Sequence, residues 1–83
     1  MDSRLIINEA WCLGVREARR RVPELPTNPN DPAYATARSH FEQEASPMVV
    51  HDPLFLSEGA RIATSYVLTD FAARGARALR RAA

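Results

Sequence analysis

Apolar residues recur every three or four positions near the start of the chain, and this spacing predicts a helix over residues 3–21. The apolar stripe consists of Ile7, Ala10, Trp11, Gly14, Val15, Ala18 and Val22. Within the stripe, Ala10, Gly14 and Ala18 are spaced by four residues. Because their side chains are small, this row favours the close approach of a second helix.

A second helix is predicted over residues 32–45. Asp31 is a suitable N-cap, and Pro32 fits the first helical position, where its missing N–H is not needed. The buried side of this helix is expected to comprise Tyr34, Ala37, Arg38, Phe41 and Ala45.

A third helix is predicted over residues 57–80, with Ser57 as its N-cap. Its apolar residues form two stripes on nearly opposite sides. One stripe comprises Ala60, Thr64, Val67, Leu68, Phe71, Gly75, Ala78 and Leu79. The other comprises Ile62, Tyr66, Ala73 and Ala76. Because a helix with two apolar faces is packed on both sides, and one chain supplies only two other helices, we expect a second copy to cover one face.

The two connections between these helices are rich in proline. The first contains prolines at 23, 26, 29 and 32, and a period of three predicts a semi-rigid polyproline-like strut. A turn at residues 27–30 is the alternative. The second, residues 46–56, predicts an extended apolar segment that must be covered by other residues. The expected fold is therefore all-α: one domain, residues 1–83, of three helices joined by the strut and the extended segment.

The length of the chain limits how large its core can be. An 83-residue chain buries roughly 60–65% of its unfolded surface. Its single cysteine, Cys12, excludes an intrachain disulfide, and no zinc-ligand spacing is present. A core this thin is commonly completed by a partner chain.

No apolar run long enough to span a bilayer is present, and we expect a cytoplasmic protein without membrane contact.

Charge is segregated along the chain. Residues 1–21 carry five arginines and three acidic residues. Residues 22–58 carry one arginine and six acidic residues, and residues 59–83 carry five arginines and one acidic residue. With basic ends flanking an acidic middle, the chain can neutralise its own charge on folding, or copies of it can bind head to tail, and neither case requires nucleic acid. All eleven basic residues are arginine and fourteen residues are alanine, a composition typical of GC-rich codons. This suggests a high-GC source, including a phage of such a host, in which case the protein would act within a virion.

The sequence contains few groupings that suggest chemistry. Cys12 has no flanking motif and lies in an apolar helix, which is typical of a structural thiol rather than a partner for His40 or His51. The pair His51–Asp52 lacks a nucleophile elbow around Ser57. In a metal site formed by His40, Glu44, His51 and Asp52, the i, i+4 spacing of His40 and Glu44 would supply two ligands on one helix face, but the His-Glu-x-x-His pattern is absent and an exposed ion pair explains the spacing equally well. We therefore expect no enzyme activity, no metal site and no cofactor.

The function expected from these features is a non-catalytic, self-associating interaction or structural subunit, acting as a homo-oligomer or within a larger protein assembly. Aromatic side chains are the expected anchors, with arginines setting the register. The expected interface residues are Trp11, Phe55, Ile62, Tyr66, Arg74 and Arg77. The alternative is a dimeric nucleic-acid-binding regulator that contacts phosphates through Arg16, Arg19, Arg20, Arg77, Arg80 and Arg81.

Overall fold

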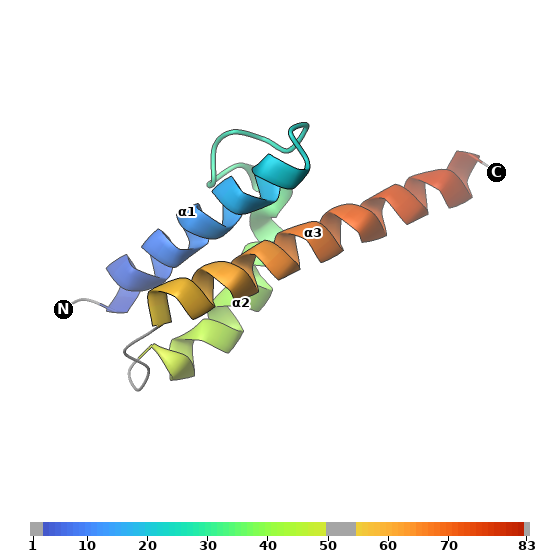
Figure 1. The fold of residues 1–83 in the computed structure, drawn as a ribbon. Helices are drawn as coiled ribbons and strands as arrows, with labels where there is room; N and C mark the ends of the chain where they lie inside the picture. Colours follow the sequence, from blue (N-terminus) through green and yellow to red (C-terminus); the bar gives the residue numbers. More distant parts are fainter. Residues whose placement is uncertain (1–2, 50–54, 83) are drawn as a thin grey trace.

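Three helices make up the fold of the protein, as seen in a computed structural model (Figure 1). The structure describes residues 3–49 and 55–82, and side chains as far as residue 75. In order, the elements are α1 (Ser3–Arg21), a 3₁₀ turn η1 (Pro32–Tyr34), α2 (Ala35–Met48) and α3 (Phe55–Ala82). Within these described ranges the chain has no strand, so the predicted all-α class is confirmed.

The first helix, α1, has the bounds that its apolar spacing predicts. Its last turn carries Arg19, Arg20 and Arg21, where positive charge complements the partial negative charge of a helix C-terminus. The Val22 amide donates a hydrogen bond to the Ala18 carbonyl at 2.8 Å, which closes the final turn. The following residues then leave the helix.

The proline-rich connection is not a strut. It forms turns, because the Leu25 amide donates to the Val22 carbonyl at 3.2 Å and the Asp31 amide to the Asn28 carbonyl at 2.9 Å. Leu25 is 4% exposed and belongs to the core. The period of three in the prolines fits a strut, but burial of Leu25 and a turn at residues 28–31, one residue later than the predicted alternative, bend the chain back over the helices.

Two buried aromatic side chains fasten this connection to the core. Trp11 Nε1 donates to the Pro29 carbonyl at 2.8 Å, and the Tyr34 hydroxyl donates to the Pro26 carbonyl at 2.5 Å. A proline carbonyl remains a full acceptor although its nitrogen has no proton. The two hydrogen bonds therefore satisfy the polar ends of Trp11 and Tyr34, which are 0% and 1% exposed.

The start of the second helical region matches the prediction, and its end does not. Asp31 Oδ1 accepts a hydrogen bond from the Ala33 amide at 2.8 Å, and Pro32 opens the 3₁₀ turn before α2. Helix α2 continues to Met48, three residues beyond the predicted end, and includes Pro47. Proline removes its own N–H donor and its ring crowds the carbonyl one turn earlier, but Pro47 lies in the last turn of α2, and the Val49 amide still donates to the Ala45 carbonyl at 3.0 Å.

Helix α3 is longer than predicted at both ends. It begins at Phe55, so Ser57 lies inside the first turn and is not the N-cap. Residues 46–48 and 55–56 of the predicted extended segment are helical, and residues 50–54 lie outside the described residues. With 28 residues, α3 is about 42 Å long at 1.5 Å per residue. Figure 1 shows it extending well beyond the ends of α1 and α2.

Trp11 is at the centre of the core. Its ring centroid lies 6.0 Å from that of Tyr34, in an edge-to-face arrangement, and 5.5 Å from that of Phe41. Aromatic pairs in this range add to the energy gained by burial alone. Val15 on α1 and Val67 on α3 complete the large side chains with almost no exposed surface. The core therefore joins all three helices.

Helices α1 and α3 make their closest approach at a glycine. A Cβ added to Gly14 would collide with the Cβ of Ala63 and lie 2.9 Å from the Ala60 carbonyl oxygen. The Thr64 hydroxyl donates to the Ala60 carbonyl at 2.8 Å and lies 3.2 Å from the Gly14 carbonyl. The close contact expected from the row of small residues in α1 is thus present, and its partner is α3.

Substituting Gly14 with alanine is expected to destabilise the fold. Because the new methyl group has no space against Ala63, the cost should be about 1–3 kcal/mol in the free energy of unfolding. Gly75→Ala is the matched control, because nothing lies within 4 Å of a Cβ at Gly75 and removing a helical glycine stabilises by about 0.5–1 kcal/mol. Urea unfolding followed by circular dichroism measures both, and an unchanged midpoint for Gly14→Ala would contradict this packing.

Candidate interaction surfaces

The structure places two of the predicted interface anchors inside the chain's own core. Trp11 is 0% exposed and Phe55 is 2% exposed. A side chain without accessible surface cannot contact a second copy of the folded chain, so these two assignments are corrected. Both residues were chosen for their aromatic character, and that character serves the core of a single chain instead.

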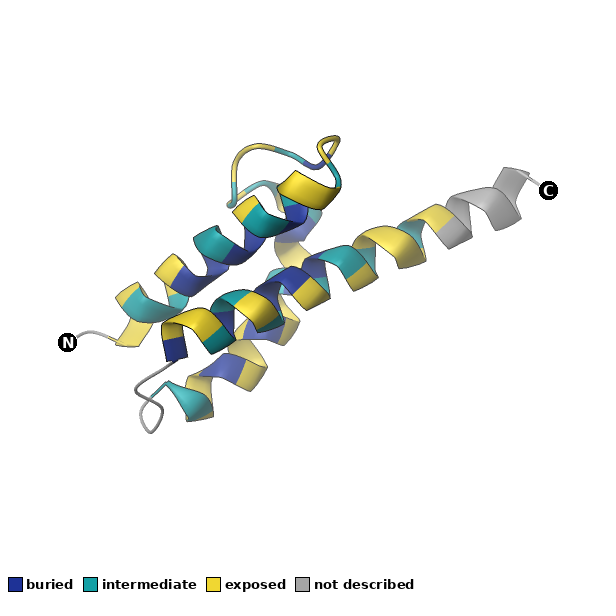
Figure 2. Ribbon diagram, in the orientation of Figure 1, coloured by how far each residue is buried: buried dark blue, intermediate teal, exposed yellow. Residues whose placement is uncertain are grey.

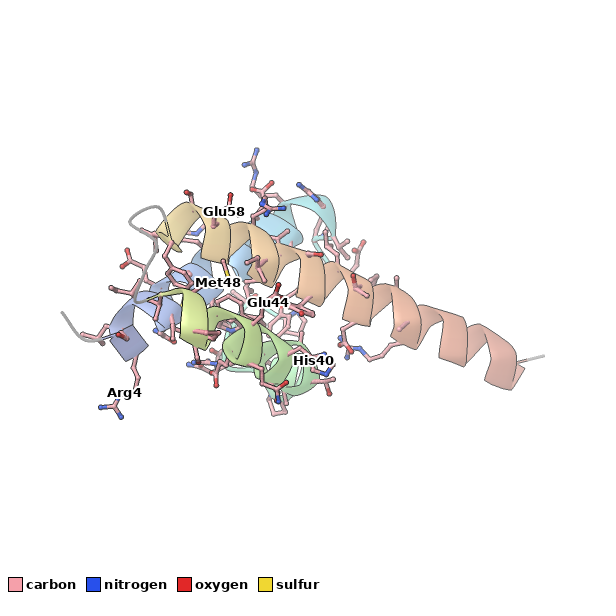
Figure 3. All side chains as sticks on the ribbon, turned by 90° about the horizontal axis from the view of Figure 1, so that it is seen from below. Arg4, His40, Glu44, Met48 and Glu58 are labelled. Atoms are coloured by element: carbon pink, nitrogen blue, oxygen red, sulfur yellow. The ribbon has the colours of Figure 1, made fainter. Side chains whose placement is uncertain are left out.

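Ile62 and Tyr66 are half-buried against the core of the same chain. The Tyr66 hydroxyl donates to Glu44 Oε2 at 2.6 Å, and its ring centroid lies 5.7 Å from that of His40. Glu44 and His40 belong to α2 (Figure 3). Along the first half of α3, one apolar face therefore packs on α1 and the other on α2. A second copy is not needed to cover that part of the helix.

The hydrogen bond to Glu44 affects the ionisation of Tyr66. It is the main reason why the pKa of Tyr66 lies above its ordinary value of 10.0, and partial desolvation acts in the same direction. A phenol that donates to a carboxylate holds its proton more tightly than a free one. The hydrogen bond between α2 and α3 is therefore complete at neutral pH.

The remaining part of α3, residues 70–82, is the first candidate surface, and we call it the overhang. Its described side chains lie mostly in contact with solvent (Figure 2), and Phe71 is 39% exposed. Arg74 is half-buried, with its Nε 3.2 Å from Asp70 Oδ2. The side chains of Arg77, Arg80 and Arg81 lie outside the described residues, but the helix continues through all three positions.

The second candidate surface is a groove of about 660 Å³ between α1 and α3, which we call the α1/α3 groove. It is lined by Leu13, Arg16, Glu17, Arg20 and Arg21 from α1, and by Ser57, Ala60, Arg61, Thr64, Ser65, Leu68 and Thr69 from α3. Leu13 and Leu68 are half-buried, whereas Arg16, Arg20 and Arg61 are exposed. The groove therefore has an apolar floor and a basic rim.

The charges around the groove are only partly neutralised. Glu17 lies 3.1 Å from Arg20 Nη1 and 3.8 Å from Arg21 Nε, so one carboxylate serves two guanidinium groups. Arg61 lies 2.7 Å from Glu58. Arg16 forms no ion pair with any described residue. Four arginines and one glutamate among the lining residues give a net charge of +3.

Arg19 differs from its neighbours on α1. Its Nε donates to the Leu25 carbonyl at 3.2 Å, and this bond holds the proline-rich connection against α1. Because the side chain is committed to this structural contact, it is a poor candidate for a phosphate contact. Arg16 and Arg20 are exposed and stay available for one.

The described residues do not assemble the chemistry considered for the sequence. Cys12 is a half-buried free thiol on α1. His40 belongs to α2 and lies beside Tyr66 of α3. His51 and Asp52 lie outside the described residues. In the described part of the chain, no group of three potential metal ligands comes together, and no helix is long and apolar enough to cross a membrane.

Comparisons of the chain with protein-family models, with curated proteins and with solved structures give no match. The two surfaces and their charges are therefore the features of the molecule that bear on its function.

The pKa of Tyr66 is expected to fall when Glu44 is replaced by alanine. The hydrogen bond that holds the phenolic proton would be absent, so the midpoint should move down toward 10.0. Burial also raises the pKa of Tyr34, so carbon-13 NMR must resolve the two rings. A Tyr66 pKa that does not respond to Glu44→Ala would contradict the contact between α2 and α3.

The same shift makes stability depend on alkaline pH. Because the folded chain holds the Tyr66 proton more tightly than the unfolded chain, this contribution is complete below pH 10.0 and is lost as the pH rises through the raised pKa. Glu44→Ala should therefore flatten the alkaline limb of a stability-against-pH curve.

Proposed function

We propose that this chain is a non-catalytic, self-associating subunit in which the overhang of one copy docks on the outer face of α2 in the next. The observation that carries the proposal is the extension of α3 beyond the helices that cover its first half (Figure 1). A helix gains most of its stability from packing an apolar face. Phe71, Ala72 and Ala73 are exposed in this region, where Phe71 borders only the proline-rich connection and the 3₁₀ turn among the described residues.

Charge supports α2 as the acceptor. The overhang contains four arginines and Asp70, a net charge of +3. The exposed side of α2 carries Glu42 and Glu44, and Glu44 also accepts the hydrogen bond from the Tyr66 hydroxyl. Glu42 Oε1 forms an ion pair with Arg38 Nε at 2.8 Å, and about half of the Glu42 side chain is exposed. Opposite charges steer association and fix its register.

Donor and acceptor are different surfaces, so the contact is heterologous. Such contacts build rings when the rotation between copies closes and open filaments when it does not. A small chain that propagates in this way acts as a structural building block. We place that role in the cytoplasm, or within a virion if a phage encodes the chain.

Self-association is expected to depend on the arginines of the overhang. Static light scattering over a concentration series should give a mass above 9.3 kDa that rises with concentration. Arg77→Glu with Arg81→Glu should abolish the rise, because the overhang would then repel α2. Arg16→Glu with Arg20→Glu changes the net charge by the same amount but lies outside the overhang. The mass of this variant should still rise with concentration.

Mixing two defective variants gives the sharpest test of the head-to-tail contact. The variant Glu42→Gln with Glu44→Gln neutralises the acceptor, keeps an amide oxygen for the Tyr66 hydroxyl and keeps the donor. The overhang variant lacks the donor and keeps the acceptor, and its reversed charge finds no positive α2 in the mixture. Together they should form a dimer of twice the 9.3 kDa chain mass and no larger species. A 9.3 kDa wild-type species at every concentration, or no dimer in the mixture, would refute the proposal.

Nucleic-acid binding is the second candidate function, favoured by the arginine-rich overhang and by the exposed Arg16 and Arg20. The structural roles of Arg19 and Glu17 reduce the basic surface available on α1. Among the described residues near these arginines, Phe71 is the one exposed aromatic ring, and none lies beside Arg16 and Arg20 to stack on a base. This candidate therefore depends mainly on phosphate contacts.

Salt dependence separates the two functions. If the chain binds duplex DNA through several phosphates, affinity should fall by about 10³-fold or more between 50 and 200 mM salt, as it does for proteins with six or more phosphate contacts. We expect instead no saturable binding to duplex DNA at 150 mM salt in a fluorescence-anisotropy titration, under conditions where light scattering detects assembly.

A further inference from the structure

The α1/α3 groove points to a ligand that the overhang does not provide. It lies on the opposite side of α3 from Tyr66 and α2: Ser57, Arg61 and Leu68 line it, and these positions face away from Tyr66 at 100° per residue. A helix laid in this groove would oppose α2 across the α1–α3 pair. The result would be a four-helix arrangement, which is a common way to complete such a core.

We propose that the α1/α3 groove binds an acidic amphipathic helix of a partner protein. The shape fits a helix because two neighbouring helices form the walls. Along α3 the groove runs from Ser57 to Thr69, which is about 18 Å at 1.5 Å per residue. That length accepts about three turns of a bound helix.

The composition of the groove specifies the faces of that helix. Leu13, Ala60 and Leu68 on the floor require aliphatic side chains at helical spacing. On the rim, Arg16 has no ion pair among the described residues, and Arg20 shares Glu17 with a neighbour. Both can bind carboxylates without breaking a strong existing contact, because exposed ion pairs contribute little.

Two other occupants fit less well. A phosphate backbone would match the rim but has no use for an apolar floor. A second copy of this chain offers no spare acidic amphipathic helix, because the apolar residues of α2 (Ala37, Phe41 and Ala45) are buried in its own core. Charge and hydrophobic pattern together therefore favour a helix from a different protein.

The test uses a synthetic peptide of about 14 residues, with leucines spaced to make one apolar face and glutamates on both flanks. Fluorescence anisotropy should show saturable binding to the wild-type chain. Arg16→Glu with Arg20→Glu should weaken binding by about tenfold or more, because two attractive pairs become repulsive. Arg77→Glu with Arg81→Glu makes the same change in net charge on the overhang and should leave binding unchanged.

NMR of the wild-type chain locates the site without any substitution. Amide shifts caused by the peptide should concentrate at Leu13, Ala60 and Leu68. A scrambled peptide of the same composition has the same charge but no apolar face, and it should bind at least tenfold more weakly. The proposal fails if the scrambled peptide binds equally well, if the shifts map elsewhere, or if duplex DNA occupies these residues more tightly than the peptide does.

The outcome is independent of self-association. Arg16→Glu with Arg20→Glu removes peptide binding and preserves assembly, whereas the overhang variant does the reverse. A protein that assembles but does not bind the peptide refutes only the proposal that the α1/α3 groove binds a partner helix. A monomer that binds it refutes only the proposed function.

Discussion

The close approach of α1 and α3 at Gly14 is the constraint on which the rest of the structure depends. A methyl group at that position would collide with Ala63, so the two helices can lie side by side only because a side chain is missing. Their contact buries the small residues of both helices on the side of Trp11 and α2. On the other side it leaves a shallow furrow, because thin side chains at the contact cannot fill the space between two helical cylinders. The α1/α3 groove is thus a geometric consequence of the small residues.

The aromatic residues have a role that their spacing alone does not show. Trp11 and Tyr34 fill the core, and their polar atoms hold the carbonyl groups of Pro29 and Pro26. A small chain without a disulfide gains order in a long connection by this means. Each hydrogen bond contributes about 1 kcal/mol net, and together they hold the backbone that buries Leu25. Trp11 and Tyr34 are therefore used within one chain, while Arg16 and Arg20 on α1 stay exposed.

Much of the fold could be predicted from local spacing, because a helix is a local structure. The bounds of α1, the Asp31 cap and the close contact at Gly14 all follow from residues within a few turns of one another. The fate of the proline-rich connection could not be predicted, since it depends on hydrogen bonds from Trp11 and Tyr34 that exist only after packing.

The candidate sites show the same limit. Arg19 and Arg20 are adjacent and chemically identical, yet one holds the Leu25 carbonyl and the other lines the groove. The groove itself joins residues 13–21 with residues 57–69, and no periodicity within one segment indicates their pairing. Two apolar faces on α3 correctly indicate two packing partners. The spacing does not tell whether those partners come from the same chain, and over the first half of α3 they do.

Charge decides how the two candidate surfaces relate to each other. By length, the overhang of one copy fits the groove of another: 13 residues span about 20 Å and the groove about 18 Å. A symmetric dimer with exchanged helix ends would then form.

However, the overhang and the groove each carry a net charge of +3. A single like-charged pair at about 6 Å costs about 0.7 kcal/mol even at the dielectric constant of water, and more where the pair is partly desolvated. Several such pairs oppose this docking and offset the gain from burying Phe71. The two surfaces therefore repel each other, so the two proposals require different acidic partners, and under them a single copy would engage both at once.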